Sequence, residues 1–146
     1  MVDFLVIGPR MSAMYDNIFP LVKDRRIMLG SLRKDISFGD EGISCRWFQN
    51  IRSFDVEPLS LKEYKEGEYD CYDHFDAINI DKTKDIPDNY YGLMGVPVTF
   101  LDKWNPDQFD VIGVGVSGTG GVDVFAPIVE GDYKYRRILI RRKKNG

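Results

Sequence analysis

Residues 2–31, VDFLVIGPRMSAMYDNIFPLVKDRRIMLGS, have the pattern of an α/β fold. Val2–Gly8 is a nearly continuous apolar run ending before a proline, which is typical of a strand buried on both faces. Ser12 is a candidate N-cap, and apolar residues at i, i+4, i+7 and i+8 predict an amphipathic helix over Ser12–Asp24. The run that starts at Ile27 predicts a second strand. The segment is therefore interpreted as a βαβ unit, which implies a parallel sheet.

The remainder of the chain predicts short extended pieces separated by loops. Residues 43–50 (ISCRWFQN) alternate as a strand, and residues 35–38 (DISF) are its expected partner. A polar loop is expected over 55–76. Further extended pieces are predicted at 77–80, 97–101, 109–115 and 135–142. We expect a partial doubly wound α/β sheet over residues 1–54 and an irregular β-rich region over 55–146, unless the two form one unit.

Length and composition narrow the class of protein. The chain has 146 residues, of which 43% are hydrophobic, so one ordinary domain with a real core is expected. No apolar run is long enough for a membrane span, and no signal-peptide pattern is present, so a cytoplasmic protein is expected. The two cysteines, Cys45 and Cys71, form no metal pattern with His74 and are expected to be reduced packing residues.

The net charge of −3 hides an uneven distribution. Residues 55–76 contain eight acids and two lysines, whereas residues 134–146 contain seven basic residues and no acid. This asymmetry predicts an acidic surface loop and a basic edge. A basic edge is suited to phosphates, although a solubilising tail explains it equally well.

Two short motifs resemble known functional motifs but lack features that those motifs require. Gly113-x-Gly115-x-x-Gly118 has the spacing of a nucleotide-binding loop, but no helical pattern and no acid-tipped strand follow it, which favours a surface loop. Asn105-Pro106-Asp107-Gln108 is close to the Asn-Pro-Pro-aromatic signature of amino-methyltransferases. It lacks the second proline, so it is interpreted as the start of a turn or helix.

Several longer blocks, in the right order, resemble the EcoRI-type adenine-specific DNA methyltransferases. The most characteristic is GVPVTFLDKWNPDQFDVIG at 95–113. The others are DFLVIG with NIFPLVKDRRIMLG near the start, CRWFQNI at 45–51, FDAINIDKTKDIPDNYYGLMGVP at 75–97 and YKYRRILIRRK at 133–143. The resemblance extends over nearly the whole chain.

This resemblance implies a fold, a cofactor and a role. The family implies a class I methyltransferase domain with a Rossmann-like sheet, an S-adenosylmethionine glycine loop and a catalytic Pro-Pro motif, both of which would lie upstream of Met1. The chain then resembles the C-terminal portion of an adenine-specific enzyme of a restriction-modification system. It would be inactive alone and would contribute recognition of double-stranded DNA. No catalytic, cofactor-binding or metal residue is assigned to this portion, whose partners would be the N-terminal methyltransferase portion or a second copy.

Candidate contact residues follow from this interpretation. A base to be methylated must leave the helix stack, and Trp47, Phe48 and Asn50 are candidates for contacting it, although core packing explains the two aromatics as well. The candidates for DNA binding are Arg136, Arg137, Arg141, Arg142, Lys143, Lys103, Asn105 and Gln108. On an alternating strand Arg137 and Arg141 share a face with Leu139, and this face is expected to be exposed.

Two other functions remain open. One is a catalytically inactive module that binds DNA or another protein. The other is a small nucleotide-binding enzyme that uses the loop at Gly113–Gly118.

Overall fold

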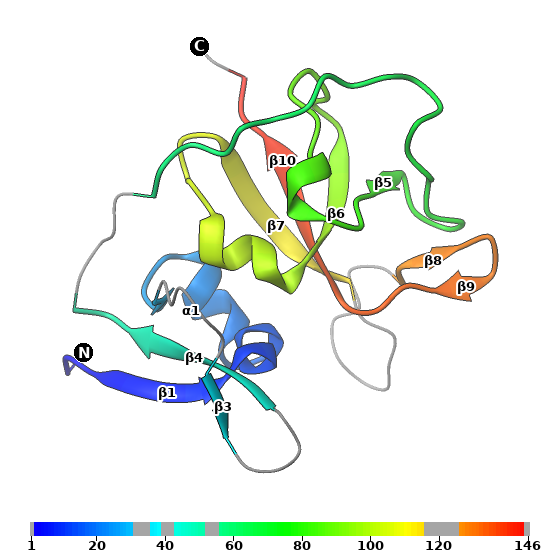
Figure 1. Cartoon of the computed structure of the whole chain (residues 1–146). Helices are drawn as coiled ribbons and strands as arrows, with labels where there is room; N and C mark the ends of the chain where they lie inside the picture. The colour runs from blue at the N-terminus through cyan, green and yellow to red at the C-terminus, as the bar shows by residue number, and fades with distance from the viewer. Residues whose placement is uncertain (1, 31–35, 39–42, 52–55, 116–125, 145–146) are drawn as a thin grey trace. The chain divides into compact units, whose positions relative to one another are not determined.

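The computed structural model describes residues 2–30, 36–38, 43–51, 56–115 and 126–144. The chain divides into two compact parts, Met1–Asp55 and Val56–Gly146, called unit 1 and unit 2 here (Figure 1). Their regular structure is mostly β, with one short α-helix and three 3-10 helices among the described residues. The α/β expectation is therefore met only in part, because strands dominate and helices are few.

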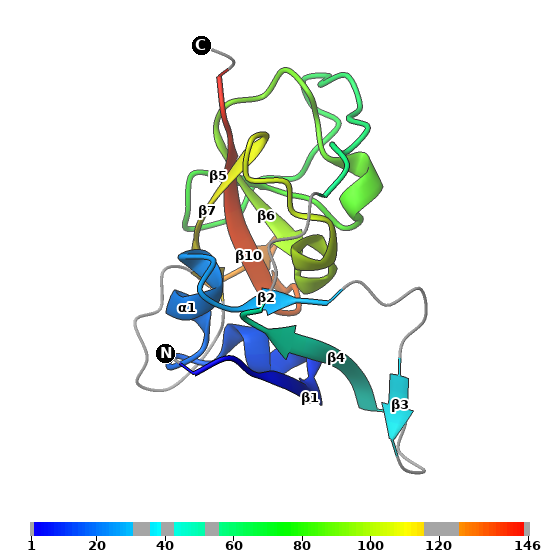
Figure 2. The ribbon, with the colours of Figure 1, turned by 90° about the vertical axis from the view of Figure 1, so that its left-hand side faces the viewer.

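Unit 1 is an antiparallel sheet built around one long strand. Its elements are β1 (Leu5–Pro9), η1 (Arg10–Met14), α1 (Phe19–Lys23), β2 (Met28–Leu29), β3 (Ile36–Phe38) and β4 (Ile43–Gln49). β4 pairs with β1, β2 and β3 and runs antiparallel to each (Figure 2). β1 and β2 consequently run in the same direction with β4 between them. The predicted βαβ unit with a parallel sheet is thus wrong, since its two strands are not neighbours and every strand pairing described in unit 1 is antiparallel. The expected pairing of residues 35–38 with 43–50 is present as β3 and β4.

The strand β1 was expected to be buried on both faces, and this is wrong. Leu5, Val6 and Ile7 are 55%, 50% and 39% exposed. β1 pairs with β4 on one side, and no other described strand pairs with it. It is therefore an edge strand among the described residues, with apolar side chains at the surface.

The predicted helix over Ser12–Asp24 is broken into η1 and α1. Pro20 has no N–H group and its ring clashes with the carbonyl four residues earlier, so proline is tolerated in the first turn of a helix and not in its interior. α1 accordingly begins at Phe19 and has Pro20 in its first turn. The buried apolar side chains of unit 1 are Ala13, Met14, Phe19, Val22, Ile27, Leu29, Cys45 and Phe48.

Unit 2 contains a mixed sheet with the strand order β5-β6-β10-β7. Its elements are β5 (Ala77–Asn79), η2 (Thr83–Asp85), β6 (Leu93–Pro97), η3 (Val98–Lys103), β7 (Phe109–Gly115), β8 (Ile128–Val129), β9 (Asp132–Tyr133) and β10 (Arg137–Arg142). β5 and β6 are parallel, whereas β10 is antiparallel to both β6 and β7. β8 and β9 form a separate hairpin that the sequence did not predict.

The core of unit 2 forms around β10. Ile138, Leu139 and Ile140 are all at most 1% exposed, as a strand paired on both edges requires when both faces are covered. Phe100 of η3 meets Phe109 of β7 edge to face, with ring centroids 5.6 Å apart.

Two sequence expectations for unit 2 have different outcomes. Residues 97–101 were expected to be extended, but Val98–Lys103 is the 3-10 helix η3 and the strand β6 precedes it. The surface loop predicted at the motif Gly113-x-Gly115-x-x-Gly118 lies outside the described residues from position 116 onwards, and Gly113 and Gly115 belong to β7.

Candidate nucleic-acid interface

Most of the basic residues singled out for DNA binding belong to β10 and its flanks. The middle of the strand, Ile138–Ile140, is buried, so the charged side chains lie at the two ends. Arg136 and Arg137 stand at the start, and residues 141–144 stand at the end. The expected division into an exposed face and a core face is wrong, because Leu139 is only 1% exposed and is buried like the two isoleucines.

Arg137 is a buried member of a polar network. It is 8% exposed, its Nε donates to Asn79 Oδ1 at 3.2 Å, and its Nη2 donates to Asp81 Oδ1 at 3.1 Å. Its Nη1 donates to the carbonyl of Tyr135 at 2.9 Å. The expectation that Arg137 is exposed is therefore wrong. Its contact with DNA stays a prediction, and its hydrogen bonds also give it a structural role.

Tyr72 completes this network. Its hydroxyl donates to Asn79 Oδ1 at 2.9 Å, and Asn79 Nδ2 donates to Asp81 Oδ1 at 2.9 Å. Burial raises the pKa of the Tyr72 phenol, and the nearby charge of Arg137 opposes this effect only in part. Tyr72 therefore remains a neutral donor at ordinary pH, and the network ties the start of β10 to β5.

Two basic side chains at the other end of β10 are neutralised by carboxylates. Arg142 Nη2 lies 2.5 Å from Asp88 Oδ1, and Lys143 Nζ lies 3.2 Å from Asp110 Oδ1. The guanidinium of Arg142 also lies 5.9 Å from the centroid of the Phe109 ring. Because each of these two cations already has a carboxylate partner, Arg142 and Lys143 attract a phosphate less strongly than an unpaired cation does.

Arg141 borders an open hollow of about 420 Å³. The hollow is lined by Asp76, Tyr90, Tyr91, Gly92, Leu93, Arg141 and Lys144, and is called the Tyr–Arg hollow below. The side chain of Arg141 makes no hydrogen bond or ion pair with another residue in the described part of the chain. Lys144 Nζ lies 5.7 Å from the centroid of the Tyr91 ring. Two tyrosine rings and two cations without carboxylate partners among the described residues thus meet at the end of β10.

Arg141 was predicted from the sequence as a contact residue, whereas the other residues that line this hollow were not. The pairing of β10 with β6 places Arg141 opposite Leu93, which brings the preceding residues Tyr90 and Tyr91 to the end of β10. The available signal was the pair of adjacent aromatics before a glycine. These tyrosines can be placed beside Arg141 only once the pairing of β6 with β10, two strands far apart in the chain, is known.

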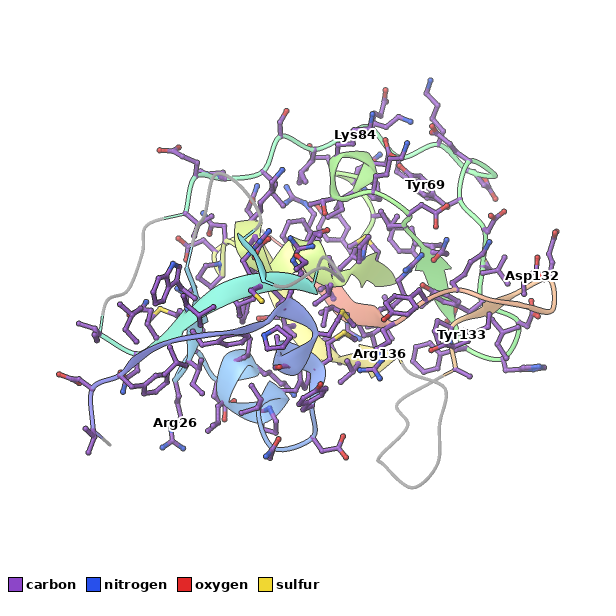
Figure 3. The ribbon with its side chains drawn as sticks, turned by 60° about the horizontal axis from the view of Figure 1, so that its bottom comes forward. Arg26, Tyr69, Lys84, Asp132, Tyr133 and Arg136 are labelled. Atoms are coloured by element: carbon purple, nitrogen blue, oxygen red, sulfur yellow. The ribbon has the colours of Figure 1, made fainter. Side chains whose placement is uncertain are left out.

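Arg136 and Lys103 are two further cations that are candidates for contacting phosphate. Arg136 is partly exposed just before β10 and is labelled in Figure 3, and Lys103 is exposed at the end of η3. Neither side chain forms an ion pair with another residue that the structure describes. Both therefore remain suited to phosphate contacts.

Asn105 and Gln108 are occupied by backbone groups of their own unit. Asn105 Oδ1 accepts from the amide of Asp107 at 2.8 Å, and its Nδ2 donates to the carbonyl of Val56 at 2.7 Å. Gln108 binds both backbone groups of Leu59: its Oε1 accepts from the amide at 2.7 Å and its Nε2 donates to the carbonyl at 3.0 Å. The segment forms the expected turn, and base reading by these two amides stays a prediction.

The candidates for a base contact in unit 1 differ in accessibility. Phe48 is 5% exposed and its ring packs against Gly8, where an added Cβ would lie 3.3 Å from a ring carbon. Asn50 is engaged by the chain before β1, since Oδ1 accepts from the amide of Phe4 at 2.8 Å and Nδ2 donates to the carbonyl of Val2 at 3.0 Å. Trp47 is only half-buried, so it retains surface that a ligand can reach.

A second hollow, of about 220 Å³, has the opposite electrostatic character. It is lined by Lys62, Glu68, Tyr69, Asp70, Asn79, Ile80, Asp81 and Asp85. Lys62 is ion-paired with Glu68, and this hydrogen bond is the main cause of the raised pKa of Lys62. The remaining acids repel phosphate, so this hollow is not a candidate for nucleic acid.

The described part of the chain contains no cluster of metal-binding side chains, and its two cysteines form no disulfide. No group of three or more His, Cys, Asp or Glu side chains is arranged there to hold a metal ion. Cys45 and Cys71 are both free thiols, and Cys71 is exposed, so the packing role expected for it is wrong. None of the helices described is long and apolar enough to cross a membrane.

The proteins that this chain resembles are type II methyltransferases. It is 37% identical to M.EcoRI of Escherichia coli, with 97% of this chain and 50% of that protein covered. It is 26% identical to M.MpnI of Mycoplasma pneumoniae and 28% identical to M.MgeORF184P of Mycoplasma genitalium, with 57% of each covered. The chain thus spans about half the length of the curated relatives it matches. No solved structure gives a significant match.

The family model described as "Adenine-specific methyltransferase EcoRI" matches residues 40–143. This match covers more than half of the chain, so the chain belongs to the EcoRI-type adenine-specific methyltransferase family. The expected family membership is confirmed.

Proposed function

We propose that this chain supplies the DNA-recognising part of a site-specific adenine DNA methyltransferase of a restriction-modification system. The observation that carries the proposal is the family match over residues 40–143, which include β4 and nearly all of unit 2. The complete enzyme would transfer a methyl group from S-adenosylmethionine to adenine in duplex DNA.

The described residues do not fit an S-adenosylmethionine loop. A nucleotide-binding glycine loop connects a strand to the N-terminus of a helix, where free amides face the ligand. Gly113 and Gly115 instead lie within β7, opposite Leu139 and Arg137 of β10. We therefore assign no cofactor contact to Gly113 and Gly115, and we propose that the rest of the complete enzyme binds the cofactor.

The exposed cations of unit 2 support a role in DNA contact. Arg141 and Lys144 stand at one end of β10, while Arg136 precedes the other end. Arginine forks and lysines bind phosphate oxygens, which fix the position of a protein on a duplex without reading its sequence. We propose Arg141 as the principal phosphate contact, because Arg142 and Lys143 already have carboxylate partners.

Unit 1 supports a role in completing a larger sheet. The edge strand β1 carries exposed apolar side chains at Leu5, Val6 and Ile7. Unpaired edges of this kind invite pairing with another strand. We propose that β1 pairs with a strand of the remaining methyltransferase sheet, or with a second copy of the chain when that sheet is missing. Trp47, which pairs with Ile7 of β1, is then the accessible candidate for the flipped base.

A salt series of duplex binding by the full chain tests this proposal. Each phosphate contact contributes about 0.9 to the slope of log affinity against log salt. Arg141→Gln is expected to weaken binding to all duplex sequences and to flatten the slope by about that amount. Lys84→Gln is the matched control, since it removes an exposed charge on η2 that does not line the hollow bordered by Arg141.

Two results contradict the proposal. One is a folded chain that binds no duplex at low salt. The other is a salt slope that Arg141→Gln leaves unchanged or that Lys84→Gln flattens equally, because either means that β10 does not face the phosphates.

A further inference from the structure

We propose that the Tyr–Arg hollow binds a single unstacked nucleotide of DNA, with its phosphate held by the two cations and its base held by the two tyrosine rings. This inference rests on the proposed function and adds a ligand and a site to it. The volume of the Tyr–Arg hollow, about 420 Å³, lies within the range of small-ligand sites.

The aromatic wall of the hollow is held in place from behind. The Tyr90 ring packs on the Tyr64 ring, with centroids 5.0 Å apart, and Tyr64 packs in turn on Tyr69 at 5.6 Å. The Tyr90 ring also lies across Gly92, where an added Cβ would come within 2.4 Å of the phenol oxygen. A ring fixed in this way loses little conformational entropy when a base packs on it.

The cations of the hollow are placed for a phosphate. Arg141 is opposite Leu93 of β6 in the sheet, so its side chain leaves the strand beside the tyrosines. Lys144 Nζ is held near the Tyr91 ring, at 5.7 Å from its centroid. Proteins that bind single-stranded DNA combine the same two features, a basic path for the backbone and aromatic rings for the bases.

The presence of Asp76 in the hollow favours a nucleotide over a bare phosphate as the ligand. Its carboxylate repels phosphate, but it accepts hydrogen bonds from base amino groups such as the N4 group of cytosine. Burial raises the pKa of Tyr90, and the charge of Asp76 adds to that effect, so the Tyr90 phenol stays neutral beside the carboxylate. A ligand with a phosphate at one end and an amino-bearing base at the other matches both charges of the hollow.

The test compares the full chain and its variants on a short single-stranded DNA oligomer and on a duplex of the same length. Tyr91→Ala is expected to weaken single-strand binding about tenfold, since base stacking on an aromatic side chain is lost, and to change duplex binding less than twofold. Tyr91→Phe keeps the ring and is expected to keep the affinity. Tyr133→Ala is the matched control, because it removes an exposed tyrosine of the β8–β9 hairpin that is not part of the hollow.

The outcomes separate this inference from the proposed function. If Tyr91→Ala weakens single-strand binding no more than Tyr133→Ala does, the proposed nucleotide site is refuted. If duplex binding persists in that case, the proposed function still stands. An equal loss on both probes also refutes the nucleotide site, because the base then need not be unstacked. Single-strand binding that depends on Tyr91 without any duplex binding supports the hollow and contradicts the proposed function.

Discussion

The guanidinium of Arg137 and the amide of Asn79 form a buried hydrogen bond, with Nε 3.2 Å from Oδ1, although the two residues are 58 positions apart in the chain. Asn79 ends β5 and Arg137 begins β10, and β6 lies between these strands in the sheet. The bond therefore joins strands that share no backbone pairing. It gives Arg137 a structural role in the fold, and the contact of this residue with DNA stays a prediction.

The first prediction concerns stability at this bond. Arg137→Ala is expected to lower the free energy of unfolding by about 1–3 kcal/mol, because buried acceptors on Asn79 and Tyr135 lose a charged donor. Arg136→Ala, one residue away and partly exposed, is the control and should stay within about 0.5 kcal/mol of wild type. Urea unfolding followed by circular dichroism measures both, and equal stabilities for the two variants would contradict the structural role of Arg137.

The second prediction concerns the Gln108 side chain and the Leu59 backbone. Gln108→Ala removes two hydrogen bonds, each worth about 0.5–1.5 kcal/mol, and is expected to loosen residues 56–60 locally. Hydrogen exchange at the Leu59 amide is the measurement, and it should accelerate. Asp107→Ala changes an exposed neighbour and should leave this amide protected. Equal protection in both variants would show that Gln108 is free for another task.

The third prediction concerns the close approach of Gly95 to Tyr72. A Cβ at Gly95 would lie 2.0 Å from the Tyr72 hydroxyl oxygen, and Tyr72 is buried and hydrogen-bonded, so it has little room to move. Gly95→Ala is expected to destabilise the protein by about 1–3 kcal/mol. In a Tyr72→Phe background the same change should cost less, since the closest atom is gone. Strict additivity of the two substitutions in urea unfolding would argue against the contact.

The fourth prediction concerns pH and Asp73. Its carboxylate accepts from the amides of Gly131 and Glu130, each at 2.8 Å, and these bonds lower the pKa of Asp73 below its ordinary value of 3.8. A lowered pKa in the folded state means that the carboxylate stabilises the fold above about pH 3.8. This contribution is lost as the pH falls through the folded-state pKa.

Asp73→Asn removes the charge and isolates this effect. Wild type should be more stable than the variant at neutral pH, and the difference should shrink below pH 3.8, which thermal unfolding at several pH values measures. A stability difference that is constant from pH 7 to pH 3 would mean that the charge of Asp73 does not hold the β8–β9 turn.

The local pattern of the sequence was sufficient for some elements and not for others. The apolar run Ile138–Ile140 predicts a strand, and the structure confirms it in the centre of a sheet. Pro20 already excludes a continuous helix over Ser12–Asp24, so that error lay in giving apolar spacing more weight than proline sterics. Val98–Lys103 shows the opposite limit, because its β-branched and aromatic residues favour a strand while the structure forms a 3-10 helix.

The candidate site depends on pairings that the sequence does not contain. Charge alone identifies the arginines of β10, but Asp88 and Asp110 neutralise Arg142 and Lys143 from other parts of the chain. Burial of Arg137 likewise depends on distant partners. Arg141 retains its charge, and the strand pairing of β6 with β10 adds the tyrosines beside it.

Adenine methylation by a hybrid enzyme tests whether this chain forms part of an adenine DNA methyltransferase. In the hybrid, this chain replaces the matching half of M.EcoRI, to which it is 37% identical. Incubation with S-adenosylmethionine and mixed-sequence duplex DNA, followed by mass spectrometry of the nucleosides, measures N6-methyladenine. Methylated adenine is expected from the hybrid and none is expected from either half alone. A folded hybrid that binds S-adenosylmethionine and duplex DNA but methylates no adenine would argue against the proposed methyltransferase function and favour an inactive binding module.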